Sequence, residues 1–218
     1  MSVSLLRIEQ AAAEHRLEIF GAFHPDATDG LPGAGGTLVL LGPDGPTFWE
    51  YFQAQPEYGD GKPDSLDRWS ERVVGDLARS FSGQSFFPFG GPPYQPFIAW
   101  ARRSGRAWLS PVNMLVHDTA GLFVSYRGAI WLPDHLALPS LPTQPCTTCK
   151  DKPCLGSCPA KAVSLGNYDV GACHEFLDLP GGKDCMQQGC LVRRSCPVSL
   201  GYGRTPSQSA FHMKAFHR

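Results

Sequence analysis

The run CTTCKDKPCLGSCP occupies residues 146–159 and holds four of the eight cysteines in this chain of 218 residues. No cysteine precedes it. The other four cysteines follow it along the chain: Cys173, Cys185, Cys190 and Cys196. Tight groups of thiols that close on a Cys-Pro step, as at Cys158 and Cys196, are typical of proteins with [4Fe–4S] clusters. Since each such cluster takes four thiolates, eight cysteines predict two [4Fe–4S] clusters.

The spacing also predicts which cysteines share a cluster. In two-cluster ferredoxins the fourth cysteine of a run ligates the other cluster. Applied here, this rule assigns one cluster to Cys146, Cys149, Cys154 and Cys196. It assigns the other cluster to Cys158, Cys173, Cys185 and Cys190. The chain departs from the usual spacing twice, because four residues separate Cys149 from Cys154 and Cys185 from Cys190. We expect residues 150–153, the first insertion, to form a turn that bulges outward.

Two other roles for clustered cysteines stay open. A disulfide framework fits the even number, but disulfides persist in oxidising compartments, and nothing in the sequence indicates one. Structural zinc also uses Cys-x-x-Cys, typically as two pairs separated by a longer loop. A zinc-stabilised binding module is therefore the alternative without redox chemistry.

The composition limits the cellular compartments and the classes of partner that we expect for this protein. Net charge is −1 and charged residues make up 18% of the chain, which indicates no bulk attraction to nucleic acid or to an anionic membrane. Hydrophobic residues make up 42%, enough for a packed core. The sequence has no apolar run of transmembrane length and no secretory signal pattern. We expect a cytoplasmic protein with neither nucleic acid nor membrane as a partner.

Hydrophobic periodicity before the cysteines predicts alternating helices and strands. The expected helices cover residues 3–16, 47–55, 64–81 and 95–103, and the expected strands cover 17–23, 37–41 and 122–132. Residues 133–145 hold four prolines and are expected to act as a linker. The predicted architecture is an α+β (α/β) domain at residues 1–135 and a loop-rich module at 136–218, with a helix in the tail at 211–218.

Two segments resemble a known family. The run from Cys146 to Pro197 is similar to the two-cluster ferredoxin module of epoxyqueuosine reductase and of corrinoid-dependent reductive dehalogenases. The likeness includes Cys173, a single cysteine between two motifs. The segment NMLVHDTAGLFVSYRGAI at 113–130 is similar to the loop and strand that precede that module. It also resembles cobalamin-processing enzymes that share the half-nitroreductase fold.

This resemblance implies a nitroreductase-like, cobalamin-binding type of domain followed by a ferredoxin-like module. A corrinoid needs a broad apolar slot with a few polar groups at its rim. The residues that we expect to bind it are aromatic or lie within the 113–130 segment: Phe87, Tyr94, Phe97, Met114, His117 and Tyr126. No catalytic residue is assigned, because no Ser/His/Asp, paired-carboxylate or P-loop pattern stands out.

The expected function follows from the cofactors. We predict an iron–sulfur oxidoreductase in which two [4Fe–4S] clusters carry electron transfer to a bound corrinoid, for cobalamin reduction or processing or for corrinoid-dependent reductive chemistry. A donor protein of the ferredoxin or flavodoxin reductase type is the expected partner. One alternative is a ferredoxin-like electron carrier whose N-terminal domain docks a partner enzyme. The other is the zinc-stabilised binding module.

Overall fold

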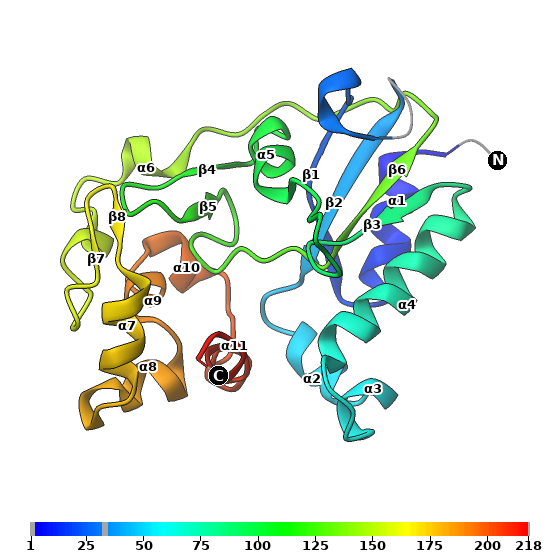
Figure 1. Cartoon of the computed structure of the whole chain (residues 1–218). Helices are drawn as coiled ribbons and strands as arrows, with labels where there is room; N and C mark the ends of the chain where they lie inside the picture. The colour runs from blue at the N-terminus through cyan, green and yellow to red at the C-terminus, as the bar shows by residue number, and fades with distance from the viewer. Residues whose placement is uncertain (1–2, 32–34, 218) are drawn as a thin grey trace. The chain divides into compact units, whose positions relative to one another are not determined.

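The computed structural model describes residues 3–31 and 35–217. The chain forms two compact units, each built from two segments (Figure 1). The first unit comprises Met1–Arg106 and Ser125–Pro142, and the second comprises Ala107–Val124 and Thr143–Arg218. This division differs from the boundary expected at residue 135 in two places. Residues 107–124 belong to the cysteine-containing unit, and residues 136–142 belong to the other.

The first unit is organised around a four-stranded sheet in the order β1-β2-β6-β3. Its strands are β1 (Leu17–Phe23), β2 (Thr37–Pro43), β3 (Gln84–Phe86) and β6 (Gly128–Leu132). Every pairing is antiparallel, so the mixed helix and sheet content belongs to the α+β class. All seven residues of β2 are buried. Strands covered on both faces read as continuous apolar runs, which is why 37–41 could be recognised in the sequence.

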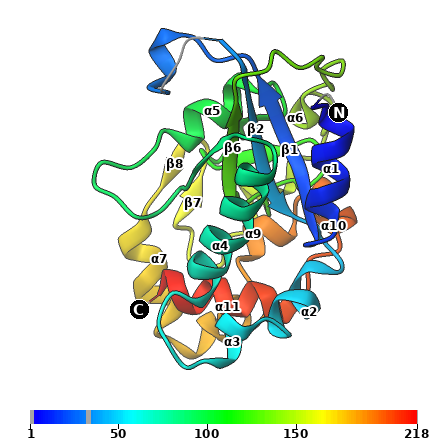
Figure 2. The ribbon, with the colours of Figure 1, turned by 90° about the vertical axis from the view of Figure 1, so that its right-hand side faces the viewer.

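Helices cover both faces of this sheet. Their bounds are α1 (Leu5–Ala13), α2 (Phe48–Gln53), α3 (Pro56–Gly59), α4 (Ser65–Ser80) and α5 (Phe97–Arg103), with a short 3-10 helix η1 at Ala27–Asp29. Figure 2 shows α1 and α4 in front of the sheet and α5 behind it. The four helices and the first two strands expected from periodicity are confirmed, with ends that differ by at most three residues.

Helix α4 is positioned by one apolar face. Leu66, Trp69, Val73 and Leu77 recur at helical spacing, and all four are at most 5% exposed. The Trp69 ring makes edge-on contacts with Phe48 and Phe52, with ring centroids 5.3 and 5.9 Å away. Aromatic pairs prefer this geometry because the positive edge of one ring meets the negative face of the other. The pairs therefore fix α2 against α4 within the first unit.

The strand expected at 122–132 is wrong in its first half. Only Gly128–Leu132 forms a strand, and Leu122 lies in the other unit. Gly121 has φ +56° and its carbonyl accepts a hydrogen bond from the Val124 N–H, so the chain turns there. The alternating pattern arises because apolar residues of this segment are buried in two different cores. Leu122 enters the core of the second unit, and Tyr126 enters the core of the first.

The second unit is built from short elements. Two hairpins pair β4 (Ala107–Leu109) with β5 (Leu115–His117) and β7 (Val163–Ser164) with β8 (Asn167–Tyr168). Its helices are α6 (Pro145–Thr148), α7 (Val170–Leu177), α8 (Lys183–Gln188), α9 (Leu191–Arg194), α10 (Pro197–Gly201) and α11 (Pro206–Phe216). Two 3-10 turns are η2 (Pro153–Leu155) and η3 (Pro180–Gly182). The helix expected in the tail is confirmed as α11, which packs on α8; Arg218 lies outside the described residues.

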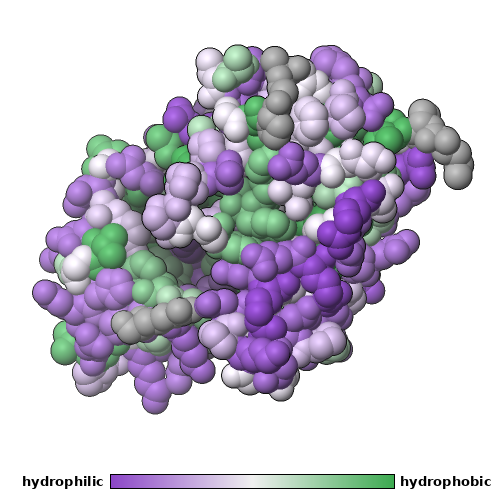
Figure 3. Space-filling model, turned by 45° about the vertical axis from the view of Figure 1, so that its right-hand side comes forward, coloured by the Kyte–Doolittle hydropathy of each residue, from purple (hydrophilic) through white to green (hydrophobic). Residues whose placement is uncertain are grey.

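In the view of Figure 3, polar residues make up much of the visible surface, and apolar residues appear in smaller areas. Within residues 3–31 and 35–217, no helix combines the length and the apolar character needed to cross a membrane.

Gly21 lies at a position in strand β1 where a side chain would clash with Ser104. It lies at an irregularity in the β1–β2 register, with φ +151°, and an added Cβ would stand 2.3 Å from Ser104 Oγ. Gly21→Ala should cost about 1–3 kcal/mol of stability, because Ser104 and the backbone must shift to make room. The expected result is a lower midpoint of thermal unfolding. Gly59→Ala is the matched control, since nothing lies within 4 Å of a Cβ there; equal midpoints for the two variants would contradict this account.

Candidate metal centre

The cysteines of the second unit fall into two sets according to which thiols affect one another's pKa, and four of them also line one cavity. Around Cys146, burial raises the thiol pKa, and the nearby thiols of Cys154, Cys196 and Cys149 raise it further. Burial likewise raises the pKa of Cys154, and the nearby thiols of Cys196 and Cys149 raise it further. We call Cys146, Cys149, Cys154 and Cys196 the first thiol group. Its members are those that the crossing rule places together.

The second thiol group consists of Cys158, Cys173, Cys185 and Cys190. Burial is the main cause that raises the pKa of Cys173, and Cys190, Cys158 and Cys185 add to it. Burial also raises the pKa of Cys185, with a further contribution from Cys190. Cys158 is assigned to the second thiol group by its effect on Cys173, although it lies four residues after Cys154 and also packs against the apolar core that contains Cys154 and Cys196. The raised pKa values of Cys146, Cys154, Cys173 and Cys185 favour their protonated forms, and a metal that binds them would have to replace those protons.

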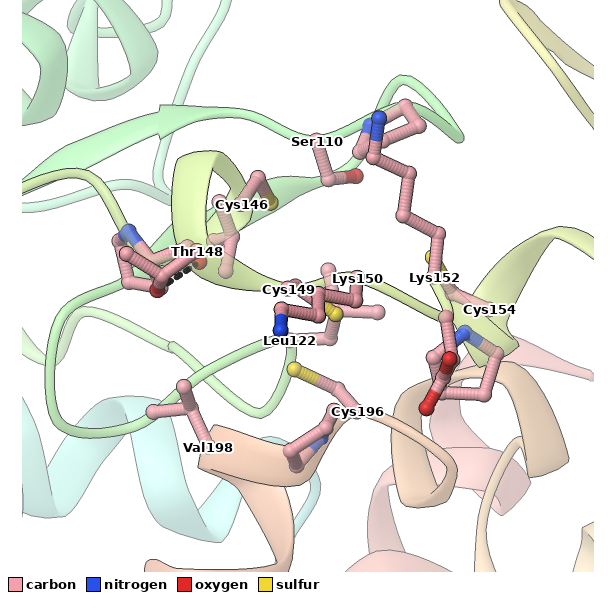
Figure 4. Close-up of a pocket in the computed structure, with 16 residues that line it drawn as sticks. Ser110, Leu122, Cys146, Thr148, Cys149, Lys150, Lys152, Cys154, Cys196 and Val198 are labelled. Atoms are coloured by element: carbon pink, nitrogen blue, oxygen red, sulfur yellow. Dashed lines mark hydrogen bonds between the residues drawn. The ribbon is translucent and has the colours of Figure 1, made fainter.

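The first thiol group lines a cavity of about 470 Å³. Figure 4 shows the four cysteine side chains around one space, with Leu122 and Val198 on its walls. Lys150 and Lys152 also line the cavity, and both are exposed. Residues 150–153 thus form the outward turn expected from the sequence, with Lys152 in the left-handed region at φ +40°. The cavity combines apolar walls, four sulfur atoms and two cationic side chains.

Proline residues place the thiols of the first thiol group. Cys146 follows Pro145 in α6, and Cys154 follows Pro153 in η2. Cys196 is the N-cap of α10, with Pro197 at the first helical position. Cys196 has an extended backbone, φ −67° and ψ 123°, as the residue before proline prefers. The Cys-Pro step at residue 196 therefore turns the chain out of the preceding helix α9 and places Cys196 at the cavity.

The segment at residues 107–124 contacts the cysteine-rich segment through residues 121–122, which follow strand β5. The Leu122 N–H donates to Ser199 Oγ at 2.8 Å. Arg193 Nη1 donates to the Leu122 carbonyl oxygen at 2.5 Å. Gly121 approaches so closely that an added Cβ would lie 2.5 Å from the Ser199 nitrogen. These contacts fix Leu122, which together with Val116 forms the apolar side of the first thiol group.

The second thiol group is positioned by helices. Cys173 lies on α7, where the Asp169 side chain caps the helix by accepting from the Ala172 N–H. Cys185 lies on α8, and Cys190 is the N-cap of α9. The Tyr168 hydroxyl donates a hydrogen bond to Cys173 Sγ, with an O–S distance of 3.7 Å. Burial, followed by this hydrogen bond, raises the pKa of Tyr168, so the phenol stays protonated and remains a donor.

All eight cysteines are free thiols, so the structure contains none of them in a disulfide. Within the described residues, no three or more His, Cys, Asp or Glu side chains form a group that could hold one metal ion. A single zinc ion holds sulfur atoms at about 2.3 Å, and thus about 3.8 Å from one another. A [4Fe–4S] cluster binds four cysteine thiolates through four separate iron atoms. The first thiol group offers four sulfur atoms around a cavity and no other ligand type. This donor set fits a [4Fe–4S] cluster better than a single zinc ion.

The corrinoid-binding candidates are distributed over both units. Phe87, Tyr94, Phe97 and Tyr126 belong to the first unit. Phe97 and Tyr126 are 6% and 7% exposed and pack against each other, with ring centroids 6.2 Å apart. Phe87 stacks on Phe89. Tyr94 is 65% exposed. Two of the four aromatic candidates are therefore core residues of the first unit.

The other two candidates lie in the second unit. Met114 is 7% exposed and packs in the apolar core that includes Cys154 and Cys196. His117 is fully buried at the end of β5. The backbone N–H groups of Thr119 and Ala120 donate to His117 Nδ1 at 3.3 Å, and Nε2 lies 3.2 Å from Asp118 Oδ1. Both ring nitrogens of His117 thus have partners within its own turn.

Two hydroxyl residues beside the thiols were missed by sequence reasoning. Tyr168 donates to Cys173, and Ser110 lines the cavity of the first thiol group. Ser110 Oγ is buried with no hydrogen-bond partner among the described residues. Such a group costs about 1–3 kcal/mol when left unpaired. Neither residue belongs to a recognisable sequence motif. Ser110 follows strand β4 of one hairpin and Tyr168 lies in the β7–β8 hairpin, so their positions depend on the fold.

Comparison of the chain with protein-family models, with curated proteins and with solved structures finds no match.

The Ser199 contact generates a local prediction. Ser199→Ala should leave the Leu122 N–H without its acceptor and loosen the turn at residues 121–124. The expected loss of about 1–3 kcal/mol corresponds to hydrogen exchange at the Leu122 amide that is roughly 5 to 150 times faster. Exchange is measured by mass spectrometry or NMR on the full chain. Ser164→Ala, at an exposed serine of β7, serves as the control. Unchanged protection of Leu122 in the Ser199 variant would rule out this role.

Proposed function

We propose that this protein is an iron–sulfur redox protein that binds two [4Fe–4S] clusters and transfers electrons one at a time. The single observation that supports the proposal most is the arrangement of eight thiols as two groups of four. Each group contains cysteines from distant parts of the segment 146–196, as the crossing rule of two-cluster ferredoxins requires. A ferredoxin-like module within the second unit is part of this proposal.

The residues present fit two clusters. Cys146, Cys149, Cys154 and Cys196 would hold the first. Cys158, Cys173, Cys185 and Cys190 would hold the second. When bound, each cluster supplies a site that accepts and returns one electron. The surrounding protein contributes burial, since Cys154, Cys185 and Cys196 are at most 9% exposed, together with the Tyr168 hydrogen bond to Cys173. Burial and hydrogen bonds to sulfur are the features by which proteins tune such clusters.

For the electron acceptor we propose a corrinoid bound by the first unit, with a nitroreductase-like role for that unit. The sequence resemblance of residues 113–130 and 146–197 supports this choice. Tyr94 is the one aromatic candidate whose hydroxyl is accessible to a cofactor rim, with 65% of its surface exposed. In this proposal the protein acts as an oxidoreductase in corrinoid reduction. Its electrons come from a donor protein of the ferredoxin or flavodoxin reductase type.

A specific observation favours a second candidate function. Phe97 and Tyr126 pack against each other, and Phe97 packs against Trp100, with ring centroids 5.1 Å apart. A first unit with a filled aromatic core suits a ferredoxin-like electron carrier, in which that unit docks a partner enzyme. Both candidates require the two clusters, and they differ only in whether the first unit binds a cofactor.

The crossing arrangement predicts which cysteines share a cluster. Protein purified without oxygen should contain iron and acid-labile sulfide and, after reduction, should show the EPR signals of two clusters. Cys154→Ser and Cys196→Ser should remove or alter one and the same signal, although 41 positions separate them. Cys158→Ser should affect the other signal, although it lies much closer to Cys154. Iron and sulfide analysis of each variant measures the loss, which should approach half of the wild-type content.

Two outcomes would overturn this proposal. Zinc in place of iron and sulfide would assign the thiols to a structural metal and support the zinc-stabilised module. Loss of the same signal in the Cys154 and Cys158 variants, with the Cys196 variant affecting the other, would show that each cluster uses consecutive cysteines. The retained signal in each variant serves as its own control for folding.

The acceptor is tested by titration of the reduced, cluster-loaded protein with cobalamin in the absence of oxygen. Corrinoid binding and reduction should shift the visible absorption bands of the cobalamin in proportion to the protein added. Tyr94→Phe should weaken binding, while Ile98→Ala, a substitution of a nearby residue that is 63% exposed, should leave it unchanged. If wild-type protein leaves the spectrum unaltered while both clusters are present, the corrinoid is excluded and the electron-carrier function is supported.

A further inference from the structure

The phenol of Tyr168 contacts one member of the second thiol group. Its oxygen lies 3.7 Å from Cys173 Sγ and donates a hydrogen bond to that sulfur. Tyr168 is half-buried and packs against the apolar core that contains Cys154 and Cys196. A buried tyrosine usually pairs its hydroxyl with a polar partner while its ring fills apolar space. Here the partner is the sulfur of a proposed cluster ligand.

The backbone on both sides of this contact is held by hydrogen bonds. Tyr168 pairs with Val163 in the β7–β8 hairpin. The Asp169 N–H donates to the Ala162 carbonyl oxygen at 2.8 Å, which continues the hairpin by one residue. The Cys173 N–H donates to the Asp169 carbonyl oxygen at 3.1 Å, in the first turn of α7. The hairpin and the first turn of the helix thus set the distance between the phenol and the thiol.

A bound cluster would fix the direction of this hydrogen bond. A thiol can donate as well as accept, whereas a thiolate that ligates iron has no proton and can only accept. The phenol keeps its proton at neutral pH and is a neutral donor. With Cys173 as a cluster ligand, Tyr168 is therefore the donor and the cysteine sulfur is the acceptor.

We propose that the Tyr168 hydroxyl raises the reduction potential of the cluster held by the second thiol group, through its hydrogen bond to Cys173 Sγ. This inference rests on the proposed function, because it requires a cluster at that site. One-electron reduction makes the cluster and its thiolate ligands more negative, and a hydrogen bond becomes stronger as its acceptor gains negative charge. The bond therefore stabilises the reduced form more than the oxidised form. Hydrogen bonds to cluster sulfur are among the factors that set these potentials.

The effect should be centred on one cluster. Burial raises the pKa of Tyr168 most, followed by the hydrogen bond to Cys173 and the charges of Cys173 and Cys190. Both of these cysteines belong to the second thiol group, so the hydroxyl lies on that side of the tyrosine. Tyr168 is a positioning residue in this account, because it acts through Cys173 and carries no electron itself.

The test removes the hydroxyl and keeps the ring. Tyr168→Phe in the full-length, cluster-loaded protein deletes the donor, while the ring can still pack against the apolar core. Tyr58→Phe is the matched control, since it deletes a hydroxyl of the first unit that accepts from Gln53 Nε2 at 3.3 Å. Both variants and the wild type are titrated with dithionite in the absence of oxygen, and EPR reports the midpoint potential of each cluster.

Tyr168→Phe should make the potential of one cluster more negative. At a fixed potential the ratio of reduced to oxidised cluster should fall about two- to tenfold, and a tenfold change corresponds to about 59 mV for a one-electron couple. The shifted signal should be the one that Cys158→Ser affects, and Tyr58→Phe should match the wild type. An unchanged or more positive potential in Tyr168→Phe would overturn the inference. Equal shifts of both clusters would also overturn it, because they would indicate a general change in burial.

A second measurement detects the hydrogen bond itself. Electron–nuclear double resonance on the reduced wild-type protein, compared in H2O and D2O, should show an exchangeable proton coupled to the second cluster that Tyr168→Phe lacks. The backbone N–H of Leu191, which donates to the Cys185 thiol, should give a coupling that both proteins keep. Identical exchangeable couplings in the two proteins would contradict the inference. The absence of any such coupling in the wild type overturns it even if the variant does not fold. Failure of the proposed function is distinguishable, since wild-type protein would then contain no iron and sulfide to titrate.

Discussion

The structure of the second unit depends on bringing sulfur atoms from both ends of the segment 146–196 to one place. Cys196 has to meet Cys146, Cys149 and Cys154, although most of the segment lies between them. Cys158 has to turn away to meet Cys173, Cys185 and Cys190. Short helices, 3-10 turns and Cys-Pro steps are the means by which the chain does this. With so little regular structure, the unit is held together by its apolar core and by the hydrogen bond at Ser199.

The first unit was predictable because burial there follows simple periodicity. Strand β1 was predicted at its observed bounds, and the apolar run of β2 reflects a strand covered on both faces. Helix α4 shows its apolar face at Leu66, Trp69, Val73 and Leu77. The antiparallel pairing was not predictable in the same way, because alternation of helices and strands in the sequence does not specify the direction of each strand in the sheet.

The cysteines of the candidate site stand out in the sequence, whereas their surroundings do not. The crossing rule of two-cluster ferredoxins separates Cys158 from Cys154, and that assignment stays a prediction. Ser110 and Tyr168 carry no spacing signal. Ser110 lines the cavity of the first thiol group because it follows β4 in the β4–β5 hairpin, and Tyr168 contacts Cys173 because β8 leads into α7. The alternation at Leu122 and Tyr126 was misleading for a related reason, since two different cores select apolar residues in one short segment.

The chain passes between its two units three times, after residues 106, 124 and 142. The hairpin at residues 107–124 supplies Val112, Met114, Val116 and Leu122 to the same apolar core as Cys154 and Cys196. An excised fragment that begins at the linker would therefore lack one wall of its own interior. The two units are therefore not independent consecutive domains that recombination could exchange freely. Insertions or deletions in either must preserve the interleaved path of the polypeptide.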